Sequence, residues 1–240
     1  MIIKKVIALL IILILGVAAG FLLSNYYQKS ATTNNQSIQI QDQQINDNTK
    51  PFKITITYPQ IVGLDDFNQE VKSLIDKEIS DFKTNSLEND TAIKETDPEN
   101  YNLYPREYDL IISYAKGEAS NDIVSVVFDI SNYTGGAHGA HYFRSVNYNP
   151  VTKAEITLAD LFPGQTDYLQ KISDFAKQDL TKQITERAGS TDGSWVDDGA
   201  SPKPENYFVF LINKDNIIFY FPQYQVAAYA LGDFQVIYPR

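Results

Sequence analysis

The chain has 240 residues, a formal net charge of −10 at neutral pH, 43% hydrophobic residues and no cysteine. This composition is that of a globular protein with one large or two small domains, and the acidic excess argues against nucleic acid as a partner because phosphate binding needs a basic surface. The absence of cysteine excludes disulfides and attachment through a lipidated cysteine. A cationic partner would be attracted, although solubility is the more ordinary role of such charge.

An uninterrupted apolar run lies near the start of the chain, over residues 6–23. It contains no charged or polar side chain, and as a helix it would span about 27 Å, close to the ~30 Å hydrocarbon core of a bilayer. Two lysines precede the run and the next basic residue is Lys29, so the positive-inside rule places the N-terminus in the cytoplasm. We expect residues 1–23 to form a signal-anchor transmembrane helix in a single-pass protein of the cell membrane, with the bulk of the chain extracytoplasmic. A cleaved secretory signal stays open, although its apolar region is usually shorter.

The chain then passes from a polar segment to a strand and a helix. Residues 24–50 are dominated by Gln, Asn, Ser, Thr and Asp and predict a disordered stalk, because they offer too little apolar surface to offset the entropy of ordering. From Phe52, apolar and polar residues alternate with the period of a half-buried strand. A helix is predicted to start at Asp66, with Gln69 completing a capping pattern, and to continue with apolar spacings of three and four as far as Phe82. The polar stretch that follows, to residue 104, predicts an irregular connection.

The remaining chain combines short strands with one further helix. The helix is predicted over residues 166–187 with Gly189 at its end, followed by a loop to residue 206. Strands are predicted over 107–115 and 123–131 as a hairpin, and over 141–148, 153–157, 207–212, 216–221 and 234–238. The order of elements indicates an α+β fold of antiparallel sheets with packed helices, preceded by one transmembrane helix. We expect a small α+β subdomain at 51–106 and a larger α+β domain at 107–240.

Two stretches carry a family resemblance. The first is Asn132-Tyr133-Thr134-Gly135-Gly136-Ala137-His138-Gly139, followed by a strand and by Leu158-Ala159-Asp160-Leu161-Phe162. The second runs from Ile217 to Gly232 and is closed by Val236-Ile237-Tyr238-Pro239. Together they resemble the extracellular domain of RsiV-type anti-sigma factors, a bacterial domain of unknown function that also precedes the catalytic domain of some peptidoglycan deacetylases.

The resemblance covers about residues 52–240 and implies an α+β domain outside the membrane. In the RsiV type this domain binds host lysozyme and triggers proteolytic signalling. Here only about five residues precede the apolar run, and the chain stops at Arg240. We therefore expect the domain without an anti-sigma or a deacetylase output.

The two histidines of the chain, His138 and His141, are the first candidate ligand-binding residues. With Asp129 they would form a three-ligand metal site. The alternative is that the neighbouring glycines were selected for backbone conformation and that the histidines hold a tight connection between strands by hydrogen bonds. The second interpretation is favoured, so no metal and no cofactor are predicted.

Aromatic residues supply the other candidates. Tyr133 belongs to the glycine-rich stretch, while Tyr224 and Tyr229 lie in the second stretch, where they either pack on a sheet or offer contact area to a partner. Trp195 lies among acidic residues in the expected loop, where it either contacts a basic protein or a sugar or fills a gap in the core.

No catalytic signature accompanies these residues. The sequence lacks a Gly-x-Ser-x-Gly elbow, a His-Glu-x-x-His pair and a phosphate-binding loop, so an enzyme is not expected. The leading hypothesis is a membrane-anchored extracytoplasmic binding module for a cell-wall-associated ligand, either a glycan or a cationic, lysozyme-like protein. A cell-wall-acting hydrolase and an assembly factor that binds another membrane protein are the alternatives.

Overall fold

The computed structural model describes residues 38–103, 106–190 and 193–240. No helix within these ranges combines the length and hydropathy needed to cross a bilayer. The transmembrane segment expected at residues 1–23 lies outside the described residues, so it stays a prediction.

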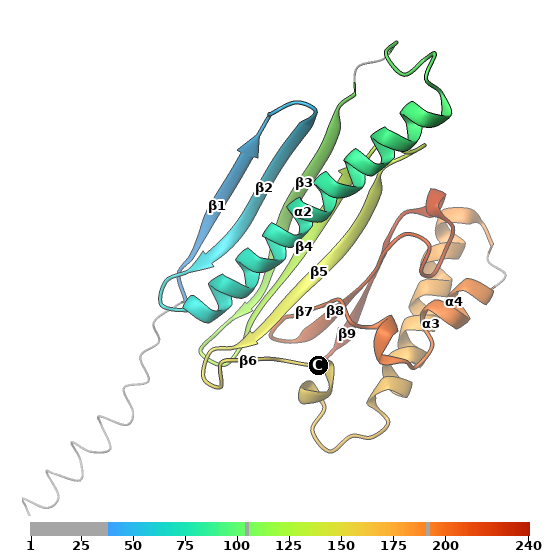
Figure 1. Cartoon of the computed structure of the whole chain (residues 1–240). Coiled ribbons are helices and arrows are strands. Elements are labelled where there is room, and N and C mark those ends of the chain that lie inside the picture. Colours follow the sequence, from blue (N-terminus) through green and yellow to red (C-terminus); the bar gives the residue numbers. More distant parts are fainter. Residues whose placement is uncertain (1–37, 104–105, 191–192) are drawn as a thin grey trace, which may run out of the picture. The chain divides into compact units, whose positions relative to one another are not determined.

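The larger sheet, here called sheet A, contains six strands in chain order. Neighbouring strands pair antiparallel except β2 and β3, which pair parallel and are joined by the long helix α2 (Asp65–Thr96). Figure 1 shows α2 lying across one face of this sheet. The six strands are β1 (Ile40–Asp47), β2 (Phe52–Ile61), β3 (Tyr108–Ala119), β4 (Val124–Tyr133), β5 (Ala140–Asn149) and β6 (Ala154–Glu155).

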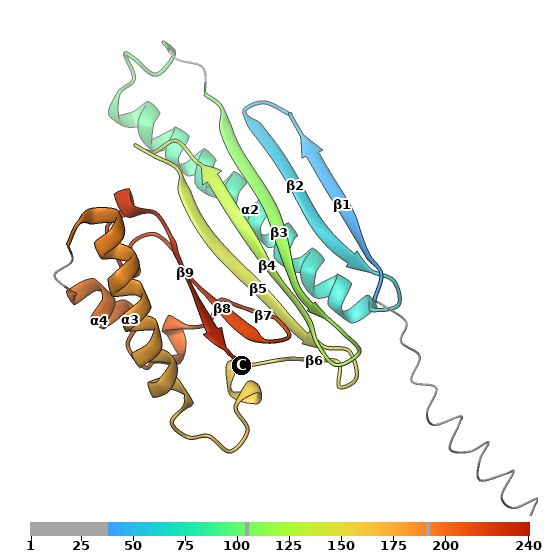
Figure 2. The same cartoon turned by 180° about the vertical axis from the view of Figure 1, so that it is seen from behind.

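The smaller sheet, sheet B, is an antiparallel three-stranded sheet with its own helices. It lies on the side of sheet A opposite α2, as the reverse view shows (Figure 2). Its strands are β7 (Phe210–Ile212), β8 (Asn216–Phe221) and β9 (Phe234–Pro239), and the helices of this half are α3 (Tyr168–Ala188), α4 (Ser194–Gly199) and the short 3-10 turns η1 (Leu158–Leu161), η2 (Pro204–Asn206) and η3 (Tyr229–Leu231).

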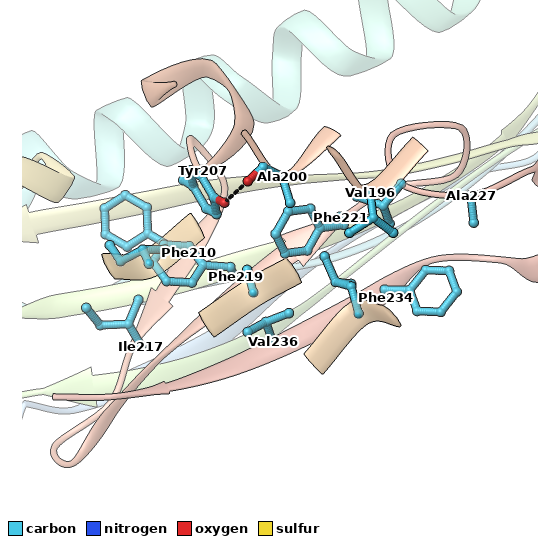
Figure 3. Close-up of a cluster of buried hydrophobic side chains, with 14 of the residues drawn as sticks. Val196, Ala200, Tyr207, Phe210, Ile217, Phe219, Phe221, Ala227, Phe234 and Val236 are labelled. Carbon is cyan, nitrogen blue, oxygen red and sulfur yellow. Dashed lines mark hydrogen bonds between the residues drawn. The ribbon is translucent and has the colours of Figure 1, made fainter. Parts of the chain in front are cut away.

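Alternation along the strands divides the interior into three apolar clusters. In β4, Val126 and Phe128 face α2, whereas Val127 between them faces sheet B. In β8, Phe219 faces α3 and Tyr220 faces sheet A. Side chains therefore fill the spaces between α2 and sheet A, between the two sheets, and between sheet B and its helices. Figure 3 shows the last of these clusters, which contains the phenylalanines of β7, β8 and β9.

The edge strand β7 is held against sheet A by buried polar groups. Ser125 Oγ of β4 accepts a hydrogen bond from the backbone N of Ile212 at 2.8 Å and donates one to Asn147 Oδ1 at 2.6 Å. Asn147 of β5 in turn donates to the backbone O of Phe210 at 3.0 Å. Gly117 of β3 allows this approach, because a Cβ atom there would lie 2.2 Å from the backbone O of Ile212.

Several expected elements differ in extent. The polar segment 24–50 was expected to be a disordered stalk, but its residues 40–47 form β1, which pairs with β2 at every position and directs Ile40 and Ile45 onto the core. Helix α2 continues to Thr96 through the stretch expected to be irregular, and Leu64 occupies its N-cap position without a side-chain cap. The helix start is stabilised instead by the negative charges of Asp65 and Asp66 in the first turn, which interact favourably with the positive end of the helix dipole.

Two further expectations concern boundaries. The loop expected at 188–206 contains α4, which packs through Val196 and Gly199. The subdomain boundary expected between residues 106 and 107 separates β2 from β3, two strands that pair in one sheet. Residues 38–240 cluster as one compact unit.

Candidate functional site

The β4–β5 connection meets the β8–β9 connection at one end of the two sheets. The rings of His138 and Tyr229 lie 4.2 Å apart between centroids, with an interplanar angle of 30°. The hydroxyl of Tyr229 donates to the backbone O of Gly139 at 3.3 Å, and His138 Nδ1 lies 2.9 Å from the same oxygen. Two segments that are 90 positions apart in the sequence thus form one surface.

Tyr224 extends this contact to a third ring. Its ring centroid lies 5.5 Å from that of Tyr229, and the residue is 54% exposed. The backbone of Tyr224 has a φ of 70°, in the left-handed region, where a bulky residue costs roughly 1–2 kcal/mol. We call His138, Tyr229 and Tyr224 the aromatic stack. The two residues at its ends, His138 and Tyr224, are both exposed.

The segment after Tyr224 is firmly anchored. Gln225 Nε2 donates to the backbone O of Gly199 at 2.9 Å and to that of Asn206 at 3.0 Å. The next two residues, Val226 and Ala227, are buried. The exposed ring of Tyr224 is therefore held on a rigid base, which is the arrangement of a preorganised binding surface.

The glycine-rich connection has the tight geometry that the conformational interpretation predicts. Gly135 has a φ of 98° and lies against the ring of Tyr108, and a Cβ atom on Gly139 would lie 2.7 Å from the backbone O of Asn132. Asn89 of α2 donates to the backbone O and the hydroxyl of Thr134, both at 3.0 Å. These contacts fix the path of the chain towards His138.

His141 lies between two carboxylates. Its Nε2 is 2.9 Å from Asp129 Oδ1 on β4, and its Nδ1 is 3.1 Å from Asp233 Oδ1 just before β9. Carboxylate oxygens only accept, so both contacts are hydrogen bonds when both ring nitrogens carry a proton. Arg187 of α3 fixes the same segment by donating to the backbone O of Asp233 at 2.8 Å. His141 therefore joins sheet A to the segment that leads into β9.

Only two of the three candidate metal ligands lie close together. His141 contacts Asp129, but His138 is directed to Tyr229 and to the backbone. Within the ranges that the structure describes, no group of three or more metal-ligating side chains is found. Nearby, burial and the negative charge of Asp129 raise the pKa of Tyr220.

The other two candidates lie apart from the aromatic stack. Tyr133 is 38% exposed at the end of β4, and Trp195 is 42% exposed in α4. The ring contacts recorded for the described part of the chain join neither of them to the stack. Sequence reasoning missed Gln225 and Asp233, because their roles depend on contacts with α4, η2 and β5 that no local pattern reveals.

Two family models match different parts of the chain. Residues 45–141 match the model described as "Deacetylase PdaC", and residues 159–240 match "Protein of unknown function (DUF3298)". His138 lies in the first match, and Tyr224 and Tyr229 lie in the second. These matches confirm the deacetylase-associated part of the resemblance, whereas the link to the RsiV type stays a prediction.

Individual relatives are distant. The chain is 29% identical to the peptidoglycan-N-acetylmuramic acid deacetylase PdaC of Bacillus subtilis over 184 residues, which cover 77% of this chain and 36% of that protein. It is 29% identical to an esterase of Mycobacterium tuberculosis over 53% of each chain. The chain thus spans only about a third to a half of the length of these two curated relatives.

A solved structure supports the fold. The crystal structure of a DUF3298-family protein from Bacteroides fragilis aligns with a TM-score of 0.56 at 20% identity, covering 86% of this chain and 92% of that one. At this identity the likeness concerns the fold alone.

Proposed function

We propose that this protein is a membrane-anchored, extracytoplasmic binding module for a cell-wall-associated ligand, either a glycan or a lysozyme-like protein, and that the aromatic stack is its binding surface. The match of residues 45–141 to a model described as a deacetylase supports the cell-wall setting. The relative from Bacillus subtilis is named for its action on peptidoglycan.

The observation that carries the proposal is the conformation of Tyr224. A tyrosine in the left-handed region is strained, and this one is more than half exposed, so its ring contributes little to the core. Strain at an exposed aromatic residue on a rigid base is typical of a residue retained for binding. Flat aromatic faces offer large contact area at low entropic cost, both to sugar rings and to side chains of a protein partner.

The test uses retention of the purified full chain on peptidoglycan sacculi and on immobilised lysozyme. We expect retention on one of them, and we expect Tyr224→Gly to reduce it about tenfold, equivalent to roughly 1.4 kcal/mol. Glycine relieves the backbone strain while the ring contact is lost, so the free energy of unfolding should change by less than about 1 kcal/mol. Phe208→Ala is the matched control, because Phe208 is 56% exposed and has no ring contact among those recorded for the described residues.

The outcomes separate the ligand classes. Retention on sacculi assigns a glycan ligand, and retention on lysozyme assigns a protein ligand. Retention on neither contradicts the proposed function. Retention that Tyr224→Gly leaves unchanged places the binding surface elsewhere and contradicts the role of the aromatic stack.

A hydrolase is the second candidate function, favoured by the names of the two relatives and by the contact of His141 with two carboxylates. It predicts release of acetate or of soluble fragments when the full chain is incubated with sacculi. If His141→Gln abolishes that release while binding is retained, the protein is an enzyme and the proposal of a binding module is wrong.

A further inference from the structure

Two cationic side chains lie on one tyrosine ring near the C-terminal end of α2. Tyr101 belongs to the segment that connects α2 to β3. The guanidinium carbon of Arg106 lies 4.9 Å from the centroid of this ring, and Lys94 Nζ of α2 lies 5.6 Å from it. The ring thus brings a lysine of the helix together with an arginine that precedes β3. We call Lys94, Tyr101 and Arg106 the cationic cluster.

The carboxylate beside these cations, that of Asp90, is already hydrogen-bonded at both oxygens. Its Oδ2 accepts from the hydroxyl of Tyr101 at 2.5 Å, and its Oδ1 accepts from the hydroxyl of Tyr108 at 2.7 Å. These hydrogen bonds, assisted by the charges of Arg106 and Lys94, hold the pKa of Asp90 below its ordinary value, so the carboxylate is ionised at neutral pH. Arg106 Nε lies 3.8 Å from Oδ1, beyond the distance of a hydrogen bond.

The guanidinium of Arg106 is left without a hydrogen bond. Its Nε is the one buried side-chain nitrogen or oxygen for which no partner is found in the part of the chain that the structure describes. A buried donor in this state costs roughly 1–3 kcal/mol, and more when it is charged. Such an atom needs an explanation, and a bound ion or water is a common one.

The outer nitrogens of the same guanidinium are accessible. No hydrogen bond is recorded for them among the described residues either, yet they are not among the buried unpartnered atoms, so they reach solvent. The side chain of Arg106 as a whole is 27% exposed. The guanidinium can therefore turn onto a ligand from solvent without breaking a hydrogen bond of the protein.

Positive charge exceeds negative charge within the cluster. Among the ion pairs recorded for residues 38–103, 106–190 and 193–240, none joins Lys94 to a carboxylate. Lys94 and Arg106 thus face the single charge of Asp90, in a chain whose formal net charge is −10. An anion placed beside the two cations would balance this local excess.

From this combination we propose that the cationic cluster binds an oxyanion, namely a carboxylate or phosphate group of a ligand. The planar fork of Arg106 donates parallel hydrogen bonds to two oxygens of the anion, and the ammonium of Lys94 adds a second positive charge. Tyr101 stays bonded to Asp90, which keeps its ring in place against the guanidinium.

This site differs from the aromatic stack, although both lie along the β4–β5 connection. Gly135 of the connection lies against Ile93 and Tyr108, next to the cationic cluster, whereas His138 contacts Tyr229. Binding of an oxyanion does not rest on the proposed function, because it involves none of the rings of the stack.

The experiment titrates the purified full chain at pH 7 with inorganic phosphate and, separately, with acetate, each replacing chloride at constant ionic strength. Binding is followed by NMR at the Nε–H resonance of Arg106, which is identified by its absence from Arg106→Lys. We expect this resonance to shift saturably. A response to phosphate alone assigns a phosphate ligand, a response to acetate alone assigns a carboxylate ligand, and a response to both assigns a site for either group.

Substitutions test the role of each cation. Arg106→Lys keeps the charge but removes the planar fork, so it should weaken binding about tenfold, measured at the backbone amides of Lys94 and Tyr101. Lys94→Gln should weaken binding about threefold, because Lys94 is exposed and contributes charge alone. Lys77→Gln is the matched control, since it removes an exposed lysine from the same helix and should leave binding unchanged.

Three results would overturn the proposal. The first is the absence of a saturable shift with both phosphate and acetate. The second is an equal loss of binding in Lys94→Gln and Lys77→Gln, which would show a non-specific response to net charge. The third is unchanged binding in Arg106→Lys, which would show that the anion does not use the guanidinium.

Discussion

At the scale of single residues, the carbonyl of Ala200 shows how the sheet B half satisfies its buried polar groups. The hydroxyl of Tyr207 donates to this oxygen at 2.6 Å (Figure 3). The hydroxyl of Ser173 donates to the same oxygen, also at 2.6 Å. Tyr207 is almost fully buried between the rings of Phe219 and Phe221. A phenol in such a place cannot ionise without placing a charge in the core, and burial raises the pKa of Tyr207 to about 12.

This pKa predicts a loss of stability at alkaline pH. The unfolded chain loses the proton of this tyrosine near pH 10, before the folded chain does, so the stabilisation present below pH 10 falls as pH rises towards 12. The loss from this group amounts to roughly 2–3 kcal/mol in the free energy of unfolding. Urea unfolding of the parent and of Tyr207→Phe, measured from pH 8 to 11.5, should show the parent's advantage shrinking over this range. A constant difference between the two curves would contradict the assignment.

At the scale of elements, periodic apolar patterns in the sequence predicted most of the helices and strands, whereas the elements with a polar sequence were missed. The strands β2, β4 and β8 and the helical spacing in the first part of α2 were correctly predicted. The strand β1 was missed because its sequence is mostly Gln, Asn and Asp, and its order comes from pairing with β2 rather than from its own burial. Likewise, the polar end of α2 is ordered by contacts such as that of Asn89 with Thr134.

The link between the sheets gives a prediction for β7. Ser125→Ala removes the hydroxyl that accepts from the backbone N of Ile212 and donates to Asn147, which leaves two buried groups without these bonds. The expected loss is about 2–4 kcal/mol in the free energy of unfolding. Hydrogen exchange at the Ile212 amide should accelerate more than at the amides of β9, because the edge strand is released first.

Ser145→Ala is the matched control for this link. Ser145 also contacts the chain around β7, but at 3.4 Å to the backbone O of Phe208 and to the backbone N of Phe210, near the limit for a hydrogen bond. Its loss should cost less than about 1 kcal/mol. Equal effects of the two alanine substitutions would show that the link does not depend on the buried hydroxyl.

At the scale of the described molecule, sequence patterns could not predict that the two sheets pack against each other with helices on their outer faces. Local periodicity states which side of a strand is buried but not which element covers it, so the face of β4 that carries Val127 could not be assigned to sheet B. The same limit applies to the candidate site. His138, Tyr224 and Tyr229 were each named from the sequence, but their contact depends on how β5 and β8 are placed by the two sheets.

The contribution of β1 to the whole fold yields the last prediction. A chain that begins at Pro51 lacks the strand that places Ile40 and Ile45 on the core and pairs Asp47 with Lys83 at 3.3 Å. Partial burial of two isoleucines contributes roughly 2–4 kcal/mol, so this chain should unfold at a clearly lower urea concentration than one that begins at Ile38, which keeps every described element. It should also self-associate more readily, because the unpaired edge of β2 presents its backbone to other chains. Equal urea midpoints for the two chains would mean that β1 adds nothing to the folded unit, and that the fold begins at Phe52 as the alternation of the sequence alone suggests.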